Sequence, residues 1–275
     1  MLAHAANACA MAPAPGVRDF LEEAARRFQA PRAHDGDLLF GVDLGTATIV
    51  LTAIDRGGSP VYWTASPSGA VRDGVVVDFG GAVETLRKLM GEAEAMLGVR
   101  VASAGTAFPP GIPEVEARAC RYVLEKAQIN CRRLVDEISA AQALLGIRDG
   151  AIVDVGGGST GVGVWEDGRL VTLDDAPGGG HHLDLILAGA LRIPVEEAER
   201  RKREADHASV LRPGIERIAS SIKRQIGSRT VPVVHLVGGA VRVSGAATVI
   251  AAFIGIPTVA YPHSDLVTPF GIAKS

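Results

Sequence analysis

The spacing of apolar residues along this chain alternates between the two-residue period of strands and the three-to-four-residue spacing of helices. Runs of apolar and β-branched residues predict strands at 38–42, 48–54, 61–64, 151–155, 161–165, 169–173 and 233–237. Apolar residues that share one face predict helices at 80–97, 114–127, 137–145, 181–191, 195–205 and 214–226. Strands interleaved with helices in this way predict an α/β fold class.

The first 37 residues differ from the rest of the chain. After an opening rich in alanine and proline, apolar residues share one face of a predicted amphipathic helix at 17–29. Pro31 ends this helix, and residues 34–37 form a predicted linker. Two interpretations are open: the helix docks on its own domain, or it is a detachable docking helix for a partner assembly.

Two segments that lie far apart in the chain repeat the same order of residue types. In each, apolar strand residues lead to an aspartate, then to a glycine two places on, then to hydroxyl residues, at 43–48 and at 154–160. Each copy then reaches a second turn at the same offset, at 55–58 and at 166–168. A strand–turn–strand unit built twice predicts two similar domains that face each other across a cleft, each with a loop of phosphate size.

The residue types in these two turns suit phosphate and metal binding. Glycines let main-chain N–H groups approach a ligand without a Cβ in the way, and successive N–H groups bind phosphate oxygens. Asp43 and Asp154 would repel phosphate, so they are suited to hold a metal ion, its waters or an attacking water. One glycine-rich hairpin turn alone is weak evidence, because such turns are common; two at matching offsets are much stronger.

Three further segments carry candidate binding residues. Residues 177–184 place glycines before a helix, where N-terminal N–H groups favour anions. Residues 236–242 place two glycines after a buried strand, where a flat ring could lie against the backbone with Arg242 stacked on it. Glu199 and Lys202 are three residues apart on one helix face, where they would hold ribose hydroxyls or form an exposed ion pair.

Composition limits the class of protein. With 275 residues, 47% of them hydrophobic, the chain can bury a core for one large or two modest domains. A net charge of −3 argues against nucleic acid or a membrane surface as partner. The most apolar stretch, 246–261, is broken by glycine and proline, so no membrane span is predicted. The first residues do not read as a secretory leader, so we expect a cytoplasmic protein. Cys9, Cys120 and Cys131 lack the spacing of a metal or redox site, so we expect inert thiols.

The order of these motifs resembles the actin-like ATPase superfamily, which includes actin, MreB and the heat-shock chaperone ATPase domain. Residues 43–48 and 154–160 resemble its two phosphate motifs, and residues 238–242 resemble its adenosine motif. Residues 137–141 and 268–273 resemble its two connecting helices. The resemblance implies two ribonuclease-H-like domains around a nucleotide cleft, with reduced accessory subdomains. They would be lobe I at 38–144, lobe II at 145–261, and a C-terminal helix at 262–275 that packs back on lobe I.

Within that superfamily the chain most closely resembles the ethanolamine utilization protein J family, which is encoded with bacterial microcompartment enzymes. Residues 71–79, 108–111, 179–182 and 197–203 carry this resemblance.

The resemblance implies a role for each matching position. Asp154 would orient or deprotonate the attacking water, Glu137 would help to position metal or water, and Asp43 and Asp154 would lie at Mg²⁺. The phosphates would contact the turn residues Gly45, Thr46, Ala47, Thr48, Gly156, Gly157, Gly158 and Ser159, and the backbone of Gly179 and Gly180. The nucleoside would be surrounded by Gly238, Gly239, Arg242, Glu199 and Lys202.

Three departures from the superfamily pattern concern hydrolysis. No lysine occurs between Phe40 and Arg87, where the heat-shock chaperones carry a catalytic one. Gly161 stands where their second phosphate loop adds an aspartate, and Ile138 replaces the usual proline of the first connecting helix. With ATP and Mg²⁺ as cofactors, nucleotide binding is therefore better supported than fast hydrolysis, and we expect at most a weak Mg-dependent ATPase.

The resemblance favours a chaperone-like protein whose lobes close around ATP and act on a protein client. The client would be a microcompartment enzyme or shell protein, so an association with the microcompartment is expected. Two alternatives stay open: a filament-forming relative of actin, and a small-molecule kinase of the same superfamily.

Overall fold

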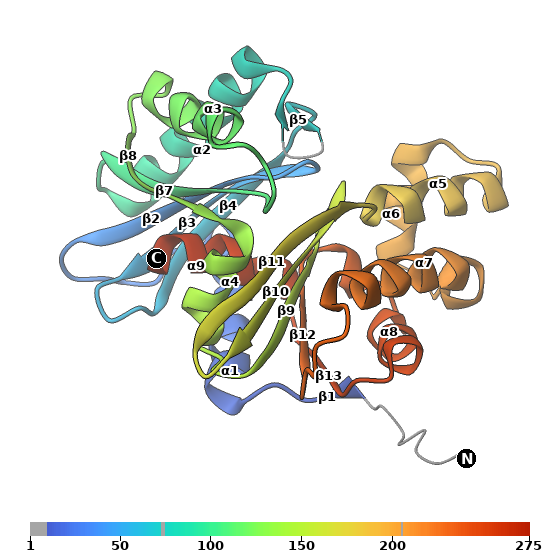
Figure 1. Cartoon of the computed structure of the whole chain (residues 1–275). Coiled ribbons are helices and arrows are strands. Elements are labelled where there is room, and N and C mark those ends of the chain that lie inside the picture. The colour runs from blue at the N-terminus through green and yellow to red at the C-terminus, as the bar shows by residue number, and fades with distance from the viewer. Residues whose placement is uncertain (1–9, 73–74, 205) are drawn as a thin grey trace, which may run out of the picture. The chain divides into compact units, whose positions relative to one another are not determined.

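The computed structural model describes residues 10–72, 75–204 and 206–275, and the chain divides into two compact units (Figure 1). Unit 1 contains the chain up to Pro13 together with Ile147–Ser264, and unit 2 contains Ala14–Gly146 together with Asp265–Ser275. The lobes predicted at 38–144 and 145–261 have their boundaries near these, but the predicted separate extension at 1–37 is divided between the units.

Unit 1 is built on a mixed sheet with the strand order β1-β13-β12-β9-β10-β11. The strands β9, β10 and β11 form an antiparallel meander, whereas β12 runs parallel to β9, and β13 and β1 continue in parallel beyond it. Their bounds are Ala10–Met11 for β1, Gly150–Val155 for β9, Ser159–Glu166 for β10, Arg169–Pro177 for β11, Val234–Val237 for β12 and Thr258–Ala260 for β13.

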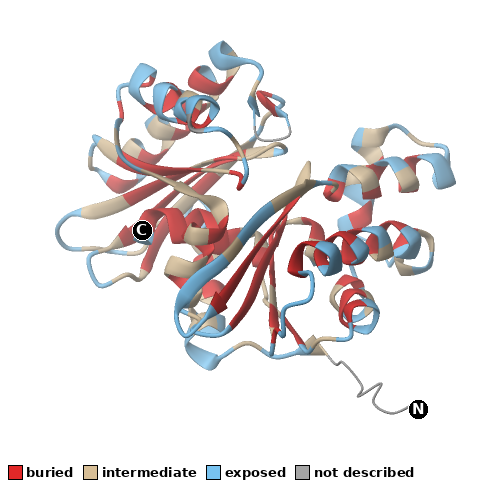
Figure 2. Ribbon diagram, in the orientation of Figure 1, coloured by how far each residue is buried: buried red, intermediate tan, exposed pale blue. Residues whose placement is uncertain are grey.

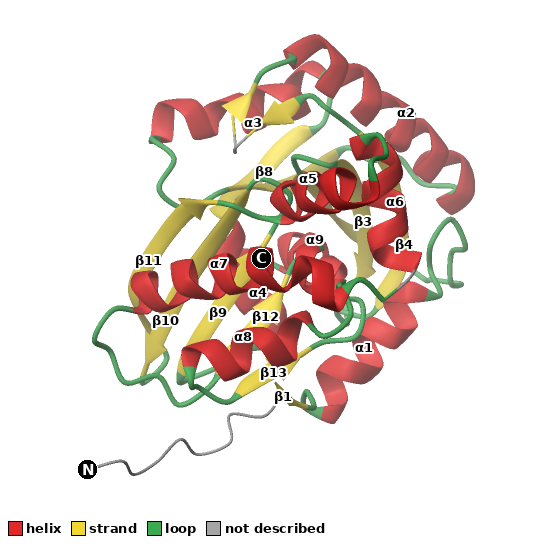
Figure 3. Ribbon diagram, turned by 90° about the vertical axis from the view of Figure 1, so that its right-hand side faces the viewer, coloured by secondary structure: helices red, strands yellow, loops and turns green. Residues whose placement is uncertain are grey.

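Helices cover one face of this sheet (Figure 3). Apolar residues on alternate positions of β9 and β10 pack with the apolar sides of the helices into one core, so β9 is buried along its whole length while β11 is largely exposed (Figure 2). The helical segments of unit 1 are α5 at Gly180–Leu191, α6 at Val195–Glu204, α7 at Ala208–Ile226, the 3₁₀ turn η1 at Ala240–Arg242 and α8 at Ala246–Ile254. The predicted helix at 195–205 is thus confirmed to residue 204; Ala205 lies outside the described residues.

Unit 2 is built on a five-stranded sheet with the order β4-β3-β2-β7-β8. Its bounds are Leu38–Leu44 for β2, Thr48–Asp55 for β3, Pro60–Pro67 for β4, Ser103–Phe108 for β7 and Asn130–Asp136 for β8. The helices α2 at Phe79–Leu97 and α3 at Glu114–Lys126 share a core with one face of this sheet. A two-stranded ribbon, β5 at Val71–Arg72 and β6 at Val75–Val76, precedes α2; residues 73–74 of the family-like segment 71–79 lie outside the described residues.

The other face of the unit 2 sheet packs against α9 at Val267–Lys274, which in turn packs on α4 at Glu137–Leu145. Backbone lies against backbone here: a Cβ on Gly271 would lie 2.0 Å from the carbonyl oxygen of Ala140, and one on Gly41 would lie 2.6 Å from the amide nitrogen of Ala273. The Thr52 hydroxyl donates to the Pro269 carbonyl at 2.9 Å. Seven consecutive residues of α9, from position 267 to position 273, are buried, so this short helix forms the interior of unit 2.

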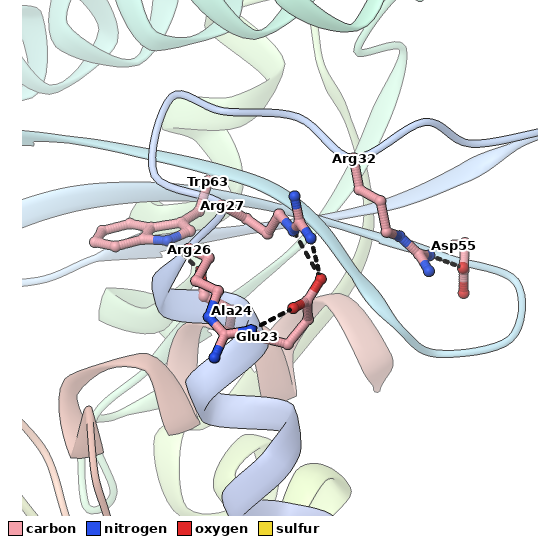
Figure 4. Close-up of polar contacts among 7 residues, drawn as sticks. All are labelled: Glu23, Ala24, Arg26, Arg27, Arg32, Asp55 and Trp63. Carbon is pink, nitrogen blue, oxygen red and sulfur yellow. Dashed lines mark hydrogen bonds and ion pairs between the residues drawn. The ribbon is translucent and has the colours of Figure 1, made fainter.

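The N-terminal helix α1, at Pro15–Ala25, docks on unit 2 (Figure 4). Leu21 and Ala24 are fully buried, and the Trp63 indole N–H donates to the Ala24 carbonyl at 2.8 Å. The Phe20 ring packs edge-on against that of Phe270. The helix ends four residues before the predicted position 29, because the chain beyond it turns to pair with the edge of β4. The docked interpretation therefore describes α1 in this structure, and β1 joins the sheet of unit 1.

Among the described residues, none of the helices combines the length and the apolar character that crossing a bilayer requires.

The glycine contact between α9 and α4 yields a stability prediction. Gly271→Ala places a methyl group against a backbone carbonyl that cannot move without shifting α4, so the free energy of unfolding is expected to fall by at least about 2 kcal/mol. Gly91→Ala is the matched control: it lies in α2 with open space around the added methyl, and should stabilise by about 0.5–1 kcal/mol. Urea unfolding measures both. Equal stability of Gly271→Ala and wild type would contradict this packing.

Candidate functional site

In unit 1, the turn between β9 and β10 is the loop that its sequence associates with phosphate. Three glycines at 156–158 join the strands, and the Gly156 N–H donates to the Ser159 carbonyl at 3.0 Å. Asp154 is only 7% exposed and lies opposite Gly161 in the strand register. Because Asp154 alternates with core valines along β9, its carboxylate lies on the sheet face away from the helical core.

The turn after β12 meets Asp154 directly. Gly238 has a φ of +92°, and a Cβ there would lie 2.3 Å from Oδ1 of Asp154. Ser264 fixes this turn twice: the Gly238 N–H donates to the Ser264 carbonyl at 3.0 Å, and the Ser264 hydroxyl donates to the Gly238 carbonyl at 2.9 Å. Only glycine fits this position, so the fold brings the predicted adenosine turn and the predicted water-activating aspartate together.

The start of α5 packs on the phosphate loop. The N–H groups of Gly180 and His181 donate to the carbonyls of Gly156 and Gly157, each at 2.9 Å. A Cβ on Gly179 would lie 2.4 Å from the Gly156 carbonyl oxygen. In this structure the Gly180 N–H is therefore bonded to the loop itself, and the expected backbone contact of Gly179 and Gly180 with a phosphate stays a prediction.

Lys202 is buried and has its polar partners on α5. Its ammonium group forms an ion pair with Asp184 at 2.6 Å, with the two side chains only 5% and 7% exposed, and donates to the Gly180 carbonyl at 3.2 Å. Burial raises the pKa of Asp184, and the hydrogen bond from Lys202 opposes that rise. Lys202 therefore ties α6 to the start of α5 rather than lying open to a ribose. Its partner Asp184 could not be identified from spacing, since it lies on a different helix.

The remaining residues predicted to surround a nucleoside lie nearer the surface. Glu199 is half exposed and its carboxylate pairs with Arg203 at 3.2 Å, so Glu199 and Lys202 share a helix face without pairing with each other. Gly239 caps η1, and Arg242 is exposed at its end. These groups are accessible to a ligand, in contrast to Lys202.

Sequence reasoning missed one carboxylate of this region, Asp175. Burial raises the pKa of Asp175 to about 6, a hydrogen bond from Ser159 opposes the rise, and the charges of Asp154 and Asp174 add to it. Its Oδ1 atom is buried without a hydrogen-bond partner, which costs about 1–3 kcal/mol for a buried acceptor. The sequence shows only two adjacent aspartates after a predicted strand. Which of them lies on the same sheet face as Asp154 depends on the strand register, which the sequence does not give.

In unit 2, the turn between β2 and β3 holds the other predicted phosphate loop. A Cβ on Gly45 would lie 2.8 Å from the Thr48 carbonyl oxygen, and the Ala47 carbonyl accepts the Ser68 N–H at 3.0 Å. Thr46 lies between them at the tip of this tight hairpin.

Asp43 and Glu137 lie at the same edge of the unit 2 sheet. Asp43 is near the end of β2, Glu137 directly follows β8, and both strands run parallel to β7, so their carboxyl ends meet at one edge. Burial raises the pKa of the Cys120 thiol to about 12, and the charges of Glu137 and Asp43 add to the rise, which places both carboxylates within electrostatic reach of one group. The structure thus brings these two predicted residues together.

Each unit has a glycine-rich turn next to an aspartate, and these residue types suit a phosphate and Mg²⁺. In unit 1, Asp175 also has one buried oxygen without a hydrogen-bond partner. No group of three or more histidine, cysteine or acidic side chains among the described residues could hold a metal by itself. That agrees with Mg²⁺ bound through one or two carboxylates, waters and the phosphates of a nucleotide.

Sequence comparison identifies relatives along almost the whole chain. The ethanolamine utilization protein EutJ of Salmonella typhimurium is 36% identical over 250 residues, which cover 90% of this chain and 88% of that protein. Sequence models of two larger families match parts of the chain: MreB/Mbl protein at residues 64–199, and cell division protein FtsA at residues 151–269.

Structure comparison agrees with the sequence. The crystal structure of the ethanolamine utilization protein EutJ from Carboxydothermus hydrogenoformans has a TM-score of 0.88 and 38% identity, and the match covers 94% of this chain and 98% of that one. MreB5 of Spiroplasma citri, in a crystal structure bound to ADP, has a TM-score of 0.69 at 18% identity, covering 85% and 94% of the two chains. The second likeness shows the fold alone.

The predicted resemblance and fold class are both confirmed by these matches. The chain belongs to the ethanolamine utilization protein EutJ family and has the actin-like ATPase fold.

Proposed function

We propose that this protein binds ATP with Mg²⁺, hydrolyses it slowly, and uses the nucleotide to control a chaperone-like interaction with enzymes or shell proteins of an ethanolamine-utilisation microcompartment. The proposal assigns the glycine turns at 45–48 and 156–159 to the phosphates, and Gly238, Gly239, Glu199 and Arg242 to the nucleoside. Asp43 and Asp154 would contact the hydration shell of Mg²⁺, and Glu137 would help to position it.

One observation carries the nucleotide part of the proposal: the meeting of Gly238, the phosphate loop and α5 around Asp154 in unit 1. These segments come from distant parts of the chain, yet their backbones approach so closely that a Cβ on Gly179 or Gly238 would lie within 2.4 Å of a neighbouring oxygen. This packing fixes the turn after β12, the loop glycines and the start of α5 in one arrangement near the Asp154 carboxylate. Glycine-rich turns after a strand or before a helix are suited to bind phosphate through backbone N–H groups.

Slow hydrolysis is proposed because two side chains that the heat-shock chaperones carry, a lysine and an aspartate, have no counterpart at the matching positions of this chain. Lysine is absent between Phe40 and Arg87, and position 161 is glycine. When Mg²⁺ is bound with the nucleotide, it would neutralise charge on the phosphates. The contribution of this chain would be to orient a water beside Asp154, whose buried position strengthens its hydrogen bonds.

Lys202 supports the site through Asp184 instead of contacting the ligand. Lys202→Met leaves the Asp184 charge buried without a partner, so the free energy of unfolding is expected to fall by about 3–5 kcal/mol. In the double variant Lys202→Met/Asp184→Leu, most of that loss should be recovered, because no buried charge remains. Urea unfolding measures all three proteins. A single variant with wild-type stability and weakened ATP binding would instead indicate direct contact with the nucleotide.

Asp154→Ala separates binding from hydrolysis. ATP turnover is expected to fall to background while ATP affinity stays within roughly tenfold of wild type, because the variant removes water activation and leaves the backbone cradle in place. Phosphate release and equilibrium binding of a fluorescent ATP analogue measure the two quantities. Undiminished turnover would exclude Asp154 as the residue that activates water.

The chaperone-like part is tested by affinity capture from the native host with and without ATP. Microcompartment enzymes or shell proteins are expected in one nucleotide state and not in the other, and Asp154→Ala should prolong the ATP state. The same proteins captured in both states would contradict nucleotide control. ATP-dependent polymers in electron micrographs of the purified protein would favour the filament-forming alternative.

A further inference from the structure

Three strands of the unit 1 sheet place Asp154, Gly161 and Asp175 in one row. The register pairs Asp154 of β9 with Gly161 of β10, and Gly161 in turn with Asp175 of β11. Residues directly opposite each other in a sheet project to the same face, so the two carboxylates share the face away from the helical core. The central position of the row has no side chain that could separate them.

The gap at Gly161 lies between Asp154 and Asp175 in the strand register. Asp175 approaches the same place from the neighbouring strand. Its strand and that of Asp154 lie about 10 Å apart, because only β10 separates them in the sheet. The electrostatic effect of Asp154 on Asp175 agrees with this proximity.

Two observations describe the polar surroundings of Asp175. Hydrogen bonding from Ser159, the first residue of β10 directly after the loop glycines, lowers the pKa of the Asp175 carboxyl against the effect of burial. The Oδ1 atom of Asp175 is buried and lacks a hydrogen-bond partner in the described structure. A carboxylate beside the phosphate loop with one unsatisfied oxygen is suited to accept a hydrogen bond from a bound water.

The neighbouring Asp174 has none of these features. It pairs with Val162, which belongs to the helical core face, so its side chain lies on the opposite side of the strand from Asp175 and is exposed. Within one strand, therefore, two adjacent aspartates differ in the face of the sheet on which they lie.

Taking the proposed nucleotide site as given, we propose that Asp175 is a positioning residue for Mg²⁺: its carboxylate accepts hydrogen bonds from the ion's waters on the sheet face that it shares with Asp154. Mg²⁺ keeps several of its waters and contacts few protein carboxylates directly, so a ligand of its hydration shell suits it. Asp154 and Asp175 then face the same hydrated ion from two strands, while Ser159 links Asp175 to the loop that would hold the phosphates. A cation beside the pair also offsets their mutual repulsion.

The test measures the equilibrium affinity for a fluorescent ATP analogue while Mg²⁺ is varied. Binding of the analogue should tighten as Mg²⁺ is added, and the Mg²⁺ concentration at half of this gain is the measured quantity. For Asp175→Asn it is expected to rise roughly tenfold, because the loss of a residue that hydrogen-bonds to the ligands of a metal typically weakens metal binding by that factor or more. The affinity in EDTA should not change. Asp174→Asn is the matched control, and its Mg²⁺ dependence should coincide with that of wild type.

Thermal unfolding of the same proteins excludes a merely structural role. Asn has nearly the shape of Asp and removes a charge that burial and two neighbouring aspartates destabilise, so Asp175→Asn should melt no lower than wild type. An Mg²⁺ dependence like that of wild type would overturn the inference, and so would parallel losses of affinity with and without Mg²⁺. A wild-type protein that binds no nucleotide in either condition would overturn the proposed function and this inference with it.

Discussion

The fold depends on close approach of backbone to backbone at positions where no Cβ fits. In unit 2, Gly271 lies against Ala140, which lets α9 pack between α4 and the sheet with its first seven residues buried. In unit 1, Gly238 lies against Asp154 and Gly179 lies against Gly156. The first contact serves the core, whereas the others form the candidate site. Glycines that allow backbone segments to approach closely therefore shape both the core of unit 2 and the candidate site of unit 1.

Polar groups beneath the unit 1 site complete this arrangement. The Lys202–Asp184 pair is buried and the Lys202 ammonium also donates to Gly180, so α6 is joined to α5 by two contacts. A buried ion pair adds little net stability, but it tolerates few alternative arrangements, because each charge needs its partner. Ser264 acts similarly on Gly238 through two hydrogen bonds. The loop, α5 and the turn after β12 are thus held by buried polar groups.

Sequence patterns predicted the parts of the fold with strong periodicity, and the structure shows why others escaped. The strand β7 consists largely of small residues. Gly105 lies so close to α9 that a Cβ on it would be only 2.9 Å from the Ile272 carbonyl oxygen. The requirement for a small residue there removes the hydrophobic signal of a central strand. The edge strand β8 carries exposed arginines, and β1 is only two residues long. Lys202 and Asp175 depended on tertiary partners and strand register, which a linear pattern cannot supply.

Binding of a nucleotide with Mg²⁺ by the glycine turns of this chain is best tested by hydrogen exchange followed by mass spectrometry, which reports on backbone N–H groups along the chain. ATP with Mg²⁺ is expected to slow exchange at 43–48 in unit 2 and at 154–161 and 236–243 in unit 1, with no change along α3. Exchange that is unchanged by ATP at all three segments, or slowed only elsewhere, would contradict it.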